Sequence, residues 1–272
     1  MTCVVVISDL HVGSVVGLWP VGAILEGGGR YQLNKYQEWL MECWQAMCED
    51  IATISPKPTL VINGDIIQGK SWRDGQLITN RGDIQANAAE LLLAPLMELV
   101  GERYVIRGTE WHEGRCSEDV SRLARSIGAV QNPTTGQYTQ WELFLEWADN
   151  TDVIHFAHHI GTSSVPWYEA TVPLRDTLLL LSELVREYQD EMPNVKLVVR
   201  SHRHRHVYVR EDVGVVVTPA WQLKTAFGYR KATSMLPHIG YVKITHNGKR
   251  FEVDEEKFPL PLPSVRKLSN EC

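Results

Sequence analysis

Cysteine is scarce, and no two cysteines are spaced as a Cys-x-x-Cys pair among the five in 272 residues. A disulfide framework and a zinc site built on paired cysteines are therefore not indicated. The chain also lacks a run approaching about 18 apolar residues, the length that a membrane helix needs. No basic leader with an apolar stretch precedes the first strand-like segment. These absences predict a reduced, cytoplasmic protein with no membrane span.

Positive charge is in deficit, because 27 Lys and Arg residues stand against 33 Asp and Glu residues, a net charge of -6. Proteins that bind nucleic acid without sequence specificity usually carry a basic excess or patch. Nucleic acid is therefore not the favoured partner, although a local basic cluster is formed by Arg200, Arg203, Arg205 and Arg210. The apolar content of 44% is ordinary for a globular chain. The oligomeric state is not indicated.

Short apolar runs alternate with longer helical patterns through most of the chain. Strands are predicted at 3–8, 59–63, 103–107, 138–147, 152–157 and 196–200, and helices at 31–54, 83–100, 118–127 and 174–191. Ser117 is expected to cap the third helix. Segments 206–218 and 239–256 are predicted to be β-rich, with a hairpin turn at Asn247-Gly248 and a tail from about 257. We expect a single α/β domain over 1–272, with two packed sheets and helices outside them.

Carboxylate and imidazole side chains follow five of the predicted strands. They are Asp9 and His11, Asp65, Glu110 and His112, His158 and His159, and His202 and His204. Because the carboxyl ends of strands in α/β proteins meet at one crevice, these side chains are expected to lie together. Oxygen and imidazole donors bind Mn, Fe or Zn, and a pair of such ions requires several donors with one carboxylate shared. The ordered set predicts a dinuclear metal centre.

The blocks that carry these donors resemble, in order, the signatures of calcineurin-like metallophosphoesterases. They are Ser8-Asp9-Leu10-His11, Asn63-Gly64-Asp65, Gly108-Thr109-Glu110-Trp111-His112, His158-His159 and Ser201-His202-Arg203-His204. The resemblance implies a four-layer αββα sandwich of two mixed sheets. It also implies that Asp9, His11 and His204 bind one ion, that His158 and His202 bind the other, and that Asp65 bridges them. Alternation along a strand allows only one of His158 and His159 to reach the metal.

The third block departs from the family pattern, which is Gly-Asn-His followed by an acid. Here Thr109, Glu110 and Trp111 separate Gly108 from His112. We expect Glu110 to replace the asparagine as a metal ligand and His112 to keep the catalytic role beside the phosphate. A site that binds metal without turnover is the competing interpretation. In the last block, Ser201 occupies the position where the family usually has glycine.

The resemblance implies hydrolysis of a phosphate ester with two divalent ions, and we expect manganese, with iron, nickel or zinc as alternatives. A hydroxide between the two ions would attack phosphorus in line, and His112 would stabilise the transition state or protonate the leaving oxygen. A phosphodiesterase is expected more than a monoesterase. The alternatives are a metal-dependent DNA nuclease and a catalytically impaired, metal-binding scaffold.

Tryptophans follow the metal blocks, at Trp19, Trp72, Trp111, Trp167 and Trp221. They either pack the loops or form a rim on which a nucleobase or an aryl group stacks. The residues expected to bind the substrate, for which a nucleotide is one candidate, are Trp72, Arg73, Trp167, Arg203 and Lys224.

Overall fold

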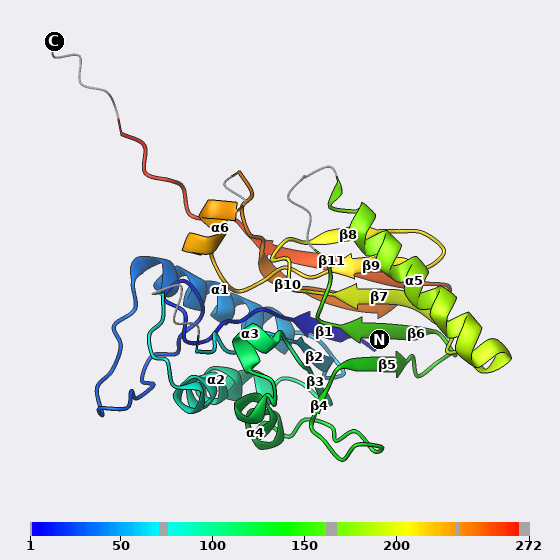
Figure 1. Cartoon of the computed structure of the whole chain (residues 1–272), viewed down its shortest axis with the longest axis horizontal. Coiled ribbons are helices and arrows are strands. Elements are labelled where there is room, and N and C mark those ends of the chain that lie inside the picture. Colours follow the sequence, from blue (N-terminus) through cyan, green and yellow to red (C-terminus); the bar gives the residue numbers. More distant parts are fainter. Residues whose placement is uncertain (1, 71–75, 162–167, 232–233, 267–272) are drawn as a thin grey trace, which may run out of the picture.

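Two mixed β-sheets lie at the centre of the structure, a computed structural model that describes residues 2–70, 76–161, 168–231 and 234–266 (Figure 1). The elements follow in the order β1 (Val4–Ile7), α1 (Lys35–Ala52), β2 (Thr59–Asn63), α2 (Gly82–Met97), β3 (Arg103–Ile106), α3 (Glu110–Glu113), α4 (Glu118–Ser126), β4 (Thr139–Gln140), β5 (Glu142–Glu146), β6 (Val153–Ala157), α5 (Thr171–Tyr188), η2 (Gln189–Glu191), β7 (Val195–Arg200), β8 (Val207–Val209), β9 (Gly214–Val217), α6 (Ala226–Lys231), β10 (Ile239–His246) and β11 (Phe251–Phe258). None of the helices in these ranges is long and apolar enough to cross a membrane.

The first sheet has the strand order β11-β10-β1-β2-β3-β4, and the second has the order β5-β6-β7-β9-β8. In the first sheet β1, β2, β3 and β4 are parallel, whereas β10 and β11 are antiparallel to their neighbours. In the second sheet β6, β7 and β9 are parallel, whereas β5 and β8 are antiparallel edge strands. The predicted pair of mixed sheets is confirmed.

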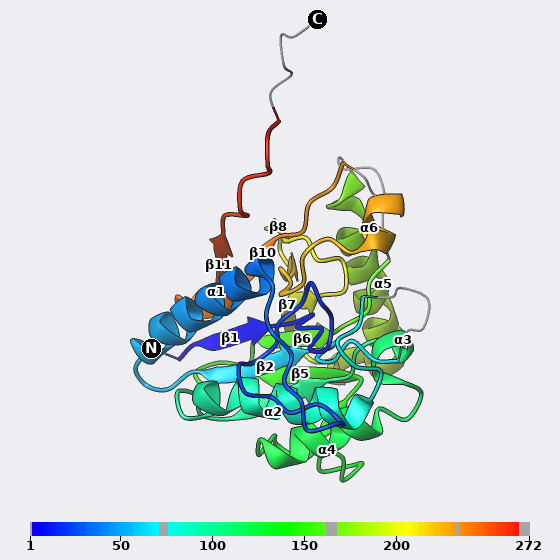
Figure 2. The same cartoon turned by 90° about the vertical axis from the view of Figure 1, so that its left-hand side faces the viewer.

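Alternation along the strands divides the apolar side chains between the layers. Val4 and Val6 of β1 belong to the core between the sheets, whereas Val5 and Ile7 belong to the core under α1, α2 and α4. In the second sheet Val199 faces the core between the sheets, and Val198 packs with residues of α5. Figure 2 shows α1 and α5 on opposite sides of the strands. The layers are therefore helices, sheet, sheet and helix, as the α/β sandwich prediction required.

Local side-chain chemistry sets the helix boundaries. The Oδ1 atom of Asn34 accepts hydrogen bonds from the backbone N–H groups of Tyr36 and Gln37 at 3.0 and 3.1 Å, and Gln37 completes a capping box. The helix α1 therefore begins four residues after the predicted start at Tyr31. Ser117 precedes α4 as predicted, but its backbone is left-handed (φ 46°) and its hydroxyl donates to Glu113 and Gly114. The predicted capping bond is wrong.

The predicted strand 138–147 is two strands that belong to different sheets. Thr139–Gln140 pairs with β3 in the first sheet, and Glu142–Glu146 pairs with β6 in the second. The exposed Trp141 lies between them. The β10–β11 hairpin turns at Asn247-Gly248 as predicted, with Gly248 at φ 88°. The strand β11 continues through Phe258, past the predicted start of the tail, and the chain then runs away from the sheets (Figure 1).

Candidate metal centre

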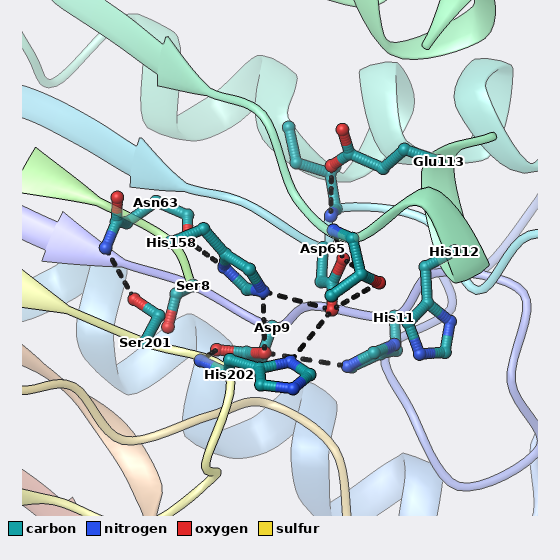
Figure 3. Close-up of polar contacts among 12 residues, drawn as sticks. Ser8, Asp9, His11, Asn63, Asp65, His112, Glu113, His158, Ser201 and His202 are labelled. Atoms are coloured by element: carbon teal, nitrogen blue, oxygen red, sulfur yellow. Dashed lines mark hydrogen bonds and ion pairs between the residues drawn. The ribbon is translucent and has the colours of Figure 1, made fainter. Parts of the chain in front are cut away.

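All the predicted ligands except Glu110 meet at the carboxyl ends of five strands drawn from both sheets. β1, β2 and β3 contribute from the first sheet, and β6 and β7 from the second. Figure 3 shows Asp9, His11, Asp65, His158 and His202 converging on one region. Sheet packing brings together residues far apart in sequence, such as His11 and His204, which are separated by 193 positions.

Three groups of donors have their ligand atoms within 4.8 Å of one another. They are Asp9 with His11 and His204, Asp65 with His158 and His202, and His11 with Asp65 and His112. The third group shares His11 with the first and Asp65 with the second, so Asp65 lies between the other two groups. Two ions with a carboxylate between them fit this arrangement.

The distances match those between ligands that share one cation. The Nε2 atoms of His11 and His204 are 3.1 Å apart, and Asp9 Oδ1 is 3.3 Å from His204 Nε2. Two ring nitrogens bound at about 2.1 Å to one ion lie about 3.0–3.4 Å apart. In the second group, Asp65 Oδ2 is 3.2 Å from His158 Nε2 and 3.9 Å from His202 Nδ1.

The backbone is strained at the candidate ligands. Seven non-glycine residues in the described ranges have positive φ, and five of them are Asp9, His11, Asp65, His202 and His204, at 45–71°. Left-handed conformations cost free energy for residues with a Cβ atom, and they persist where the surrounding structure imposes them at functional sites. The sequence does not signal this strain.

Several buried atoms of the centre have no hydrogen-bond partner among the described residues, including Asp9 Oδ1 and His158 Nε2. His158 Nδ1 donates to the carbonyl oxygen of Asn63 at 2.6 Å, which directs Nε2 toward the carboxylates of Asp65 and Asp9, at 3.2 and 3.9 Å. An outer hydrogen bond of this kind is the usual way to orient a metal-binding imidazole. A cation fits these orphaned donors, since it would satisfy both atoms at once.

The carboxylates and imidazoles of the centre shift one another's pKa values, because they are buried close together. Burial opposes ionisation of Asp9, but the imidazoles of His158 and His204 outweigh it and hold the pKa of this carboxyl well below its ordinary value. Burial likewise opposes charge on His158, yet Asp65 and Asp9 raise its pKa to about 10. The pKa of His11 falls to about 4 because of burial and the nearby His112. In the absence of metal, a proton on His158 balances part of the carboxylate charge.

The third block does not bring Glu110 to the donor groups of the described residues. Its carboxylate is exposed and pairs with Arg115 at 2.6 Å. Thr109 instead donates from its backbone N–H (2.6 Å) and its hydroxyl (3.0 Å) to Asp65 Oδ1. Gly108 is required here, because a Cβ atom would lie 2.2 Å from the Asp65 backbone nitrogen.

Glu113 is a buried acid that the sequence analysis did not single out. Its side chain lies beside Gly108, and Oε1 accepts a long hydrogen bond of 3.5 Å from the backbone N–H of Ile66 (Figure 3). Burial, followed by the charge of Asp65, raises its pKa to about 7. Its position directly after His112 was the available signal, since the family pattern places an acid after the histidine.

The structure separates the two neighbouring histidines of the fourth block. His158 is buried among the donors, whereas His159 is exposed. The ring of His159 lies beside those of His158 and His202, with centroids 5.4 and 5.9 Å away. His158 is therefore the one that joins a donor group.

A cavity of about 330 Å³ adjoins the centre through His112. His112 Nδ1 donates to the carbonyl oxygen of Gln68 at 2.7 Å, which leaves Nε2 as the nitrogen that can meet a substrate. The other polar and aromatic residues that line the cavity include Lys70, Trp111, Cys116 and Asp119.

The structure describes only some of the predicted substrate-binding residues. Trp72, Arg73 and Trp167 lie outside the described residues. Arg203 Nη1 donates to the backbone carbonyl of Glu169 at 2.7 Å, and Lys224 Nζ lies 4.7 Å from the centroid of the Tyr229 ring.

Two of the five tryptophans cannot form a stacking rim. Trp19 and Trp221 are 1% and 0% exposed, and Trp221 packs edge-on against Trp44 with centroids 5.1 Å apart. For these two the rim interpretation is wrong, because their loops fold back onto the core. Trp111 is 54% exposed at the cavity.

Comparison with known proteins places the chain near several solved structures. It is similar to a predicted phosphoesterase from Streptococcus pneumoniae, at 10% identity and a TM-score of 0.40 over 94% of this chain and 88% of that one. It is also similar to vacuolar protein sorting 29 from Cryptosporidium parvum, at 10% identity and a TM-score of 0.40 over 94% and 97%. A dimetal phosphatase from Danio rerio aligns at 11% identity and a TM-score of 0.45 over 93% and 95%. No protein-family model and no curated sequence matches the chain. Likeness at these scores carries no functional assignment, which therefore depends on the donors themselves.

Proposed function

We propose that this protein is a dinuclear metal-dependent phosphoesterase that hydrolyses phosphodiesters. The observation that carries the proposal is a pair of three-residue donor groups, each with two buried members and one partly buried histidine, with Asp65 between them and with backbone that is strained at five of the ligands. Burying this many donors and holding them in strained conformations costs stability, which a bound pair of cations would offset.

Asp9, His11 and His204 would hold one ion, and Asp65, His158 and His202 the other. Thr109 occupies Asp65 Oδ1 with two hydrogen bonds, so Oδ2 is directed toward the histidines. The mixed oxygen and imidazole set suits manganese, which we prefer to iron, nickel or zinc. When bound, two such ions supply positive charge, which lowers the pKa of a water to near neutral and offsets the negative charge of the phosphoryl oxygens.

His112 has the position of a general acid. The Gln68 carbonyl fixes its ring through Nδ1, and the buried Gln222 in turn donates to the Gln68 side chain at 2.7 Å. His112 forms one donor group with His11 and Asp65 and also lines the cavity. A protonated Nε2 would give its proton to the leaving oxygen, which removes the need to expel an alkoxide.

The cavity beside His112 is the natural place for the leaving alcohol. The exposed face of Trp111 offers a surface for an aryl group or a nucleobase, and Lys70 and Asp119 offer polar contacts. The second ester group of a diester would remain outside this cavity, near His159, whose ring lies 5.9 Å from that of His202.

The test uses the metal-stripped protein with bis-p-nitrophenyl phosphate and p-nitrophenyl phosphate, with Mn, Ni, Zn or Mg added back in turn. We expect metal-dependent turnover that prefers the diester and is lost in Asp65→Asn. Asp149→Asn is a matched control, because this exposed aspartate lies in the turn at the far end of β6. Two bound ions without turnover of either ester would instead support a scaffold, and cleavage of duplex DNA in place of the esters would support a nuclease.

A further inference from the structure

A chain of hydrogen bonds between buried hydroxyl groups lies directly beneath the candidate metal centre. Asn63 Nδ2 donates to Ser201 Oγ at 2.6 Å, Ser201 Oγ is 2.7 Å from Thr218 Oγ1, and Thr218 Oγ1 is 2.7 Å from Ser8 Oγ. Ser8 Oγ donates to the carbonyl oxygen of Pro219 at 3.1 Å. The four side chains are 0% exposed. We refer to Asn63, Ser201, Thr218 and Ser8 as the hydroxyl relay.

The groups at the two ends of the relay determine the direction in which each hydroxyl donates its hydrogen bond. A carbonyl oxygen only accepts, so the Ser8 proton points to Pro219, and Thr218 must donate to Ser8. Because the single hydroxyl proton of Thr218 is donated to Ser8, Ser201 must donate to Thr218. The Asn63 amide in turn donates to Ser201. Each hydroxyl then makes one donated and one accepted bond along this path.

Three of the four relay residues lie one or two positions from a candidate ligand in the sequence. Ser8 immediately precedes Asp9, and Ser201 immediately precedes His202 (Figure 3). Asn63 is two residues before Asp65, and its backbone carbonyl holds the ring of His158. The second amide proton of Asn63 binds the Ala157 carbonyl at 3.1 Å, directly before His158.

The relay also joins the two sheets. Ser8 and Asn63 end β1 and β2 of the first sheet, whereas Ser201 and Thr218 follow β7 and β9 of the second. Both donor groups draw ligands from both sheets, because Asp9 and Asp65 come from the first and His158, His202 and His204 from the second. The separation of the sheets at this point therefore sets the spacing of the ligands.

Strained ligands need such a support. Asp9, Asp65 and His202 have φ angles of 53°, 51° and 71°, and conformations of this kind persist only where neighbouring contacts impose them. The three hydroxyls of the relay are each paired as donor and as acceptor, although Asn63 Oδ1 has no partner among the described residues. The loss of one hydroxyl would leave further groups unpaired in a low dielectric. Glycine is the usual residue at position 201 in the family that the sequence resembles. A glycine there would have no hydroxyl to connect the Asn63 amide to the Thr218 hydroxyl by hydrogen bonds.

We propose that the hydroxyl relay is a positioning device that sets the spacing of the two donor groups, with Ser201 and Thr218 as the residues that couple the sheets. The inference rests on the proposed metal centre. It assigns the relay no contact with substrate, so its residues act only through the ligands that they hold.

The test is a matched pair of substitutions at Thr218, which is not adjacent in sequence to any ligand. Thr218→Val keeps the shape but removes the hydroxyl, whereas Thr218→Ser keeps the hydroxyl and loses only a methyl group. Val216→Ala, in the core between the sheets on the same strand, controls for loss of stability without breaking the relay. Ser8→Ala interrupts the relay at a second residue and serves if Thr218→Val does not fold.

The readouts are Mn²⁺ affinity by calorimetry and the electron paramagnetic resonance spectrum of the two-manganese form, whose exchange coupling depends on the distance between the ions. Substitution of an outer-shell partner typically weakens metal binding by about 10–100-fold. We expect Thr218→Val to show such a loss and an altered coupling, with Thr218→Ser close to wild type. Val216→Ala should lower the melting temperature and leave both metal readouts unchanged.

Wild-type affinity and an unchanged coupled spectrum in folded Thr218→Val would overturn the positioning role and leave the metal centre intact. Equal losses in Thr218→Val and Val216→Ala would also overturn it, because instability alone would then explain the effect. Failure of the wild-type protein to bind two ions would instead overturn the proposed function, and the inference with it.

Discussion

Replacement of Glu113 by glutamine should stabilise the metal-free protein in a manner that depends on pH. Glu113 is 6% exposed, and its ordinary pKa of 4.5 is raised to about 7 by burial and by Asp65. The folded state therefore holds a proton that the unfolded state releases. The stability that this proton contributes is complete below pH 4.5 and is lost as the pH rises toward 7.

The size of the effect follows from the two pKa values. Ionising this carboxyl in the folded protein costs about 3 kcal/mol more than in the unfolded chain. Glutamine has a similar shape and never ionises. The gain in unfolding free energy for Glu113→Gln should therefore be below about 1 kcal/mol at pH 5 and about 3 kcal/mol at pH 8.

Urea unfolding of the metal-stripped proteins at several pH values measures this difference. Glu118→Gln is the control, since Glu118 is exposed at the start of α4 and should give a small difference at every pH. A gain for Glu113→Gln that is the same at pH 5 and pH 8 would refute the reasoning. So would a loss of stability at pH 8, because the carboxylate would then be stabilised by contacts that glutamine cannot replace.

Three further predictions concern the metal ligands and the tryptophans. Because His158 is protonated in the metal-free protein, Mn²⁺ binding should release a proton, and the affinity for Mn²⁺ should rise by about tenfold per pH unit below pH 10. Calorimetry in buffers of different ionisation enthalpy would detect the released proton, and an affinity independent of pH would contradict the prediction. Glu110→Gln should still bind two ions, since the carboxylate faces Arg115, and the loss of one ion on elemental analysis would restore Glu110 as a ligand. Trp221→Ala should lower the free energy of unfolding by about 3–5 kcal/mol, as measured with denaturant. Trp111→Ala should change this free energy by less than about 0.5 kcal/mol but raise KM for aryl esters. An unchanged KM would remove Trp111 from the substrate site.

Features set by strand periodicity were accessible from sequence. The apolar runs at 3–8, 59–63 and 196–200 indicate buried strands, and polar residues that follow such strands in an α/β protein are expected at the carboxyl ends of the sheets, where ligands bind. Seven of the predicted site residues, Asp9, His11, Asp65, His112, His158, His202 and His204, form the three donor groups for this reason.

Features set by tertiary packing were not accessible. Segment 138–147 has strand character throughout, yet its partners divide it at Trp141 between two sheets. The orientation of α3 decides that Glu113 is buried and Glu110 exposed, although both are acids in the same short segment. The hydroxyl relay joins residues up to 210 positions apart, which no local pattern reveals.

The most direct test of the metal centre is anomalous diffraction from crystals loaded with Mn²⁺, recorded on wild type and on Asp65→Asn. We expect two manganese peaks in the wild type, one among Asp9, His11 and His204 and one among Asp65, His158 and His202, and the loss of at least one peak in the variant. Crystals of the loaded protein with no manganese at these six side chains, or with manganese bound only elsewhere, would contradict this expectation.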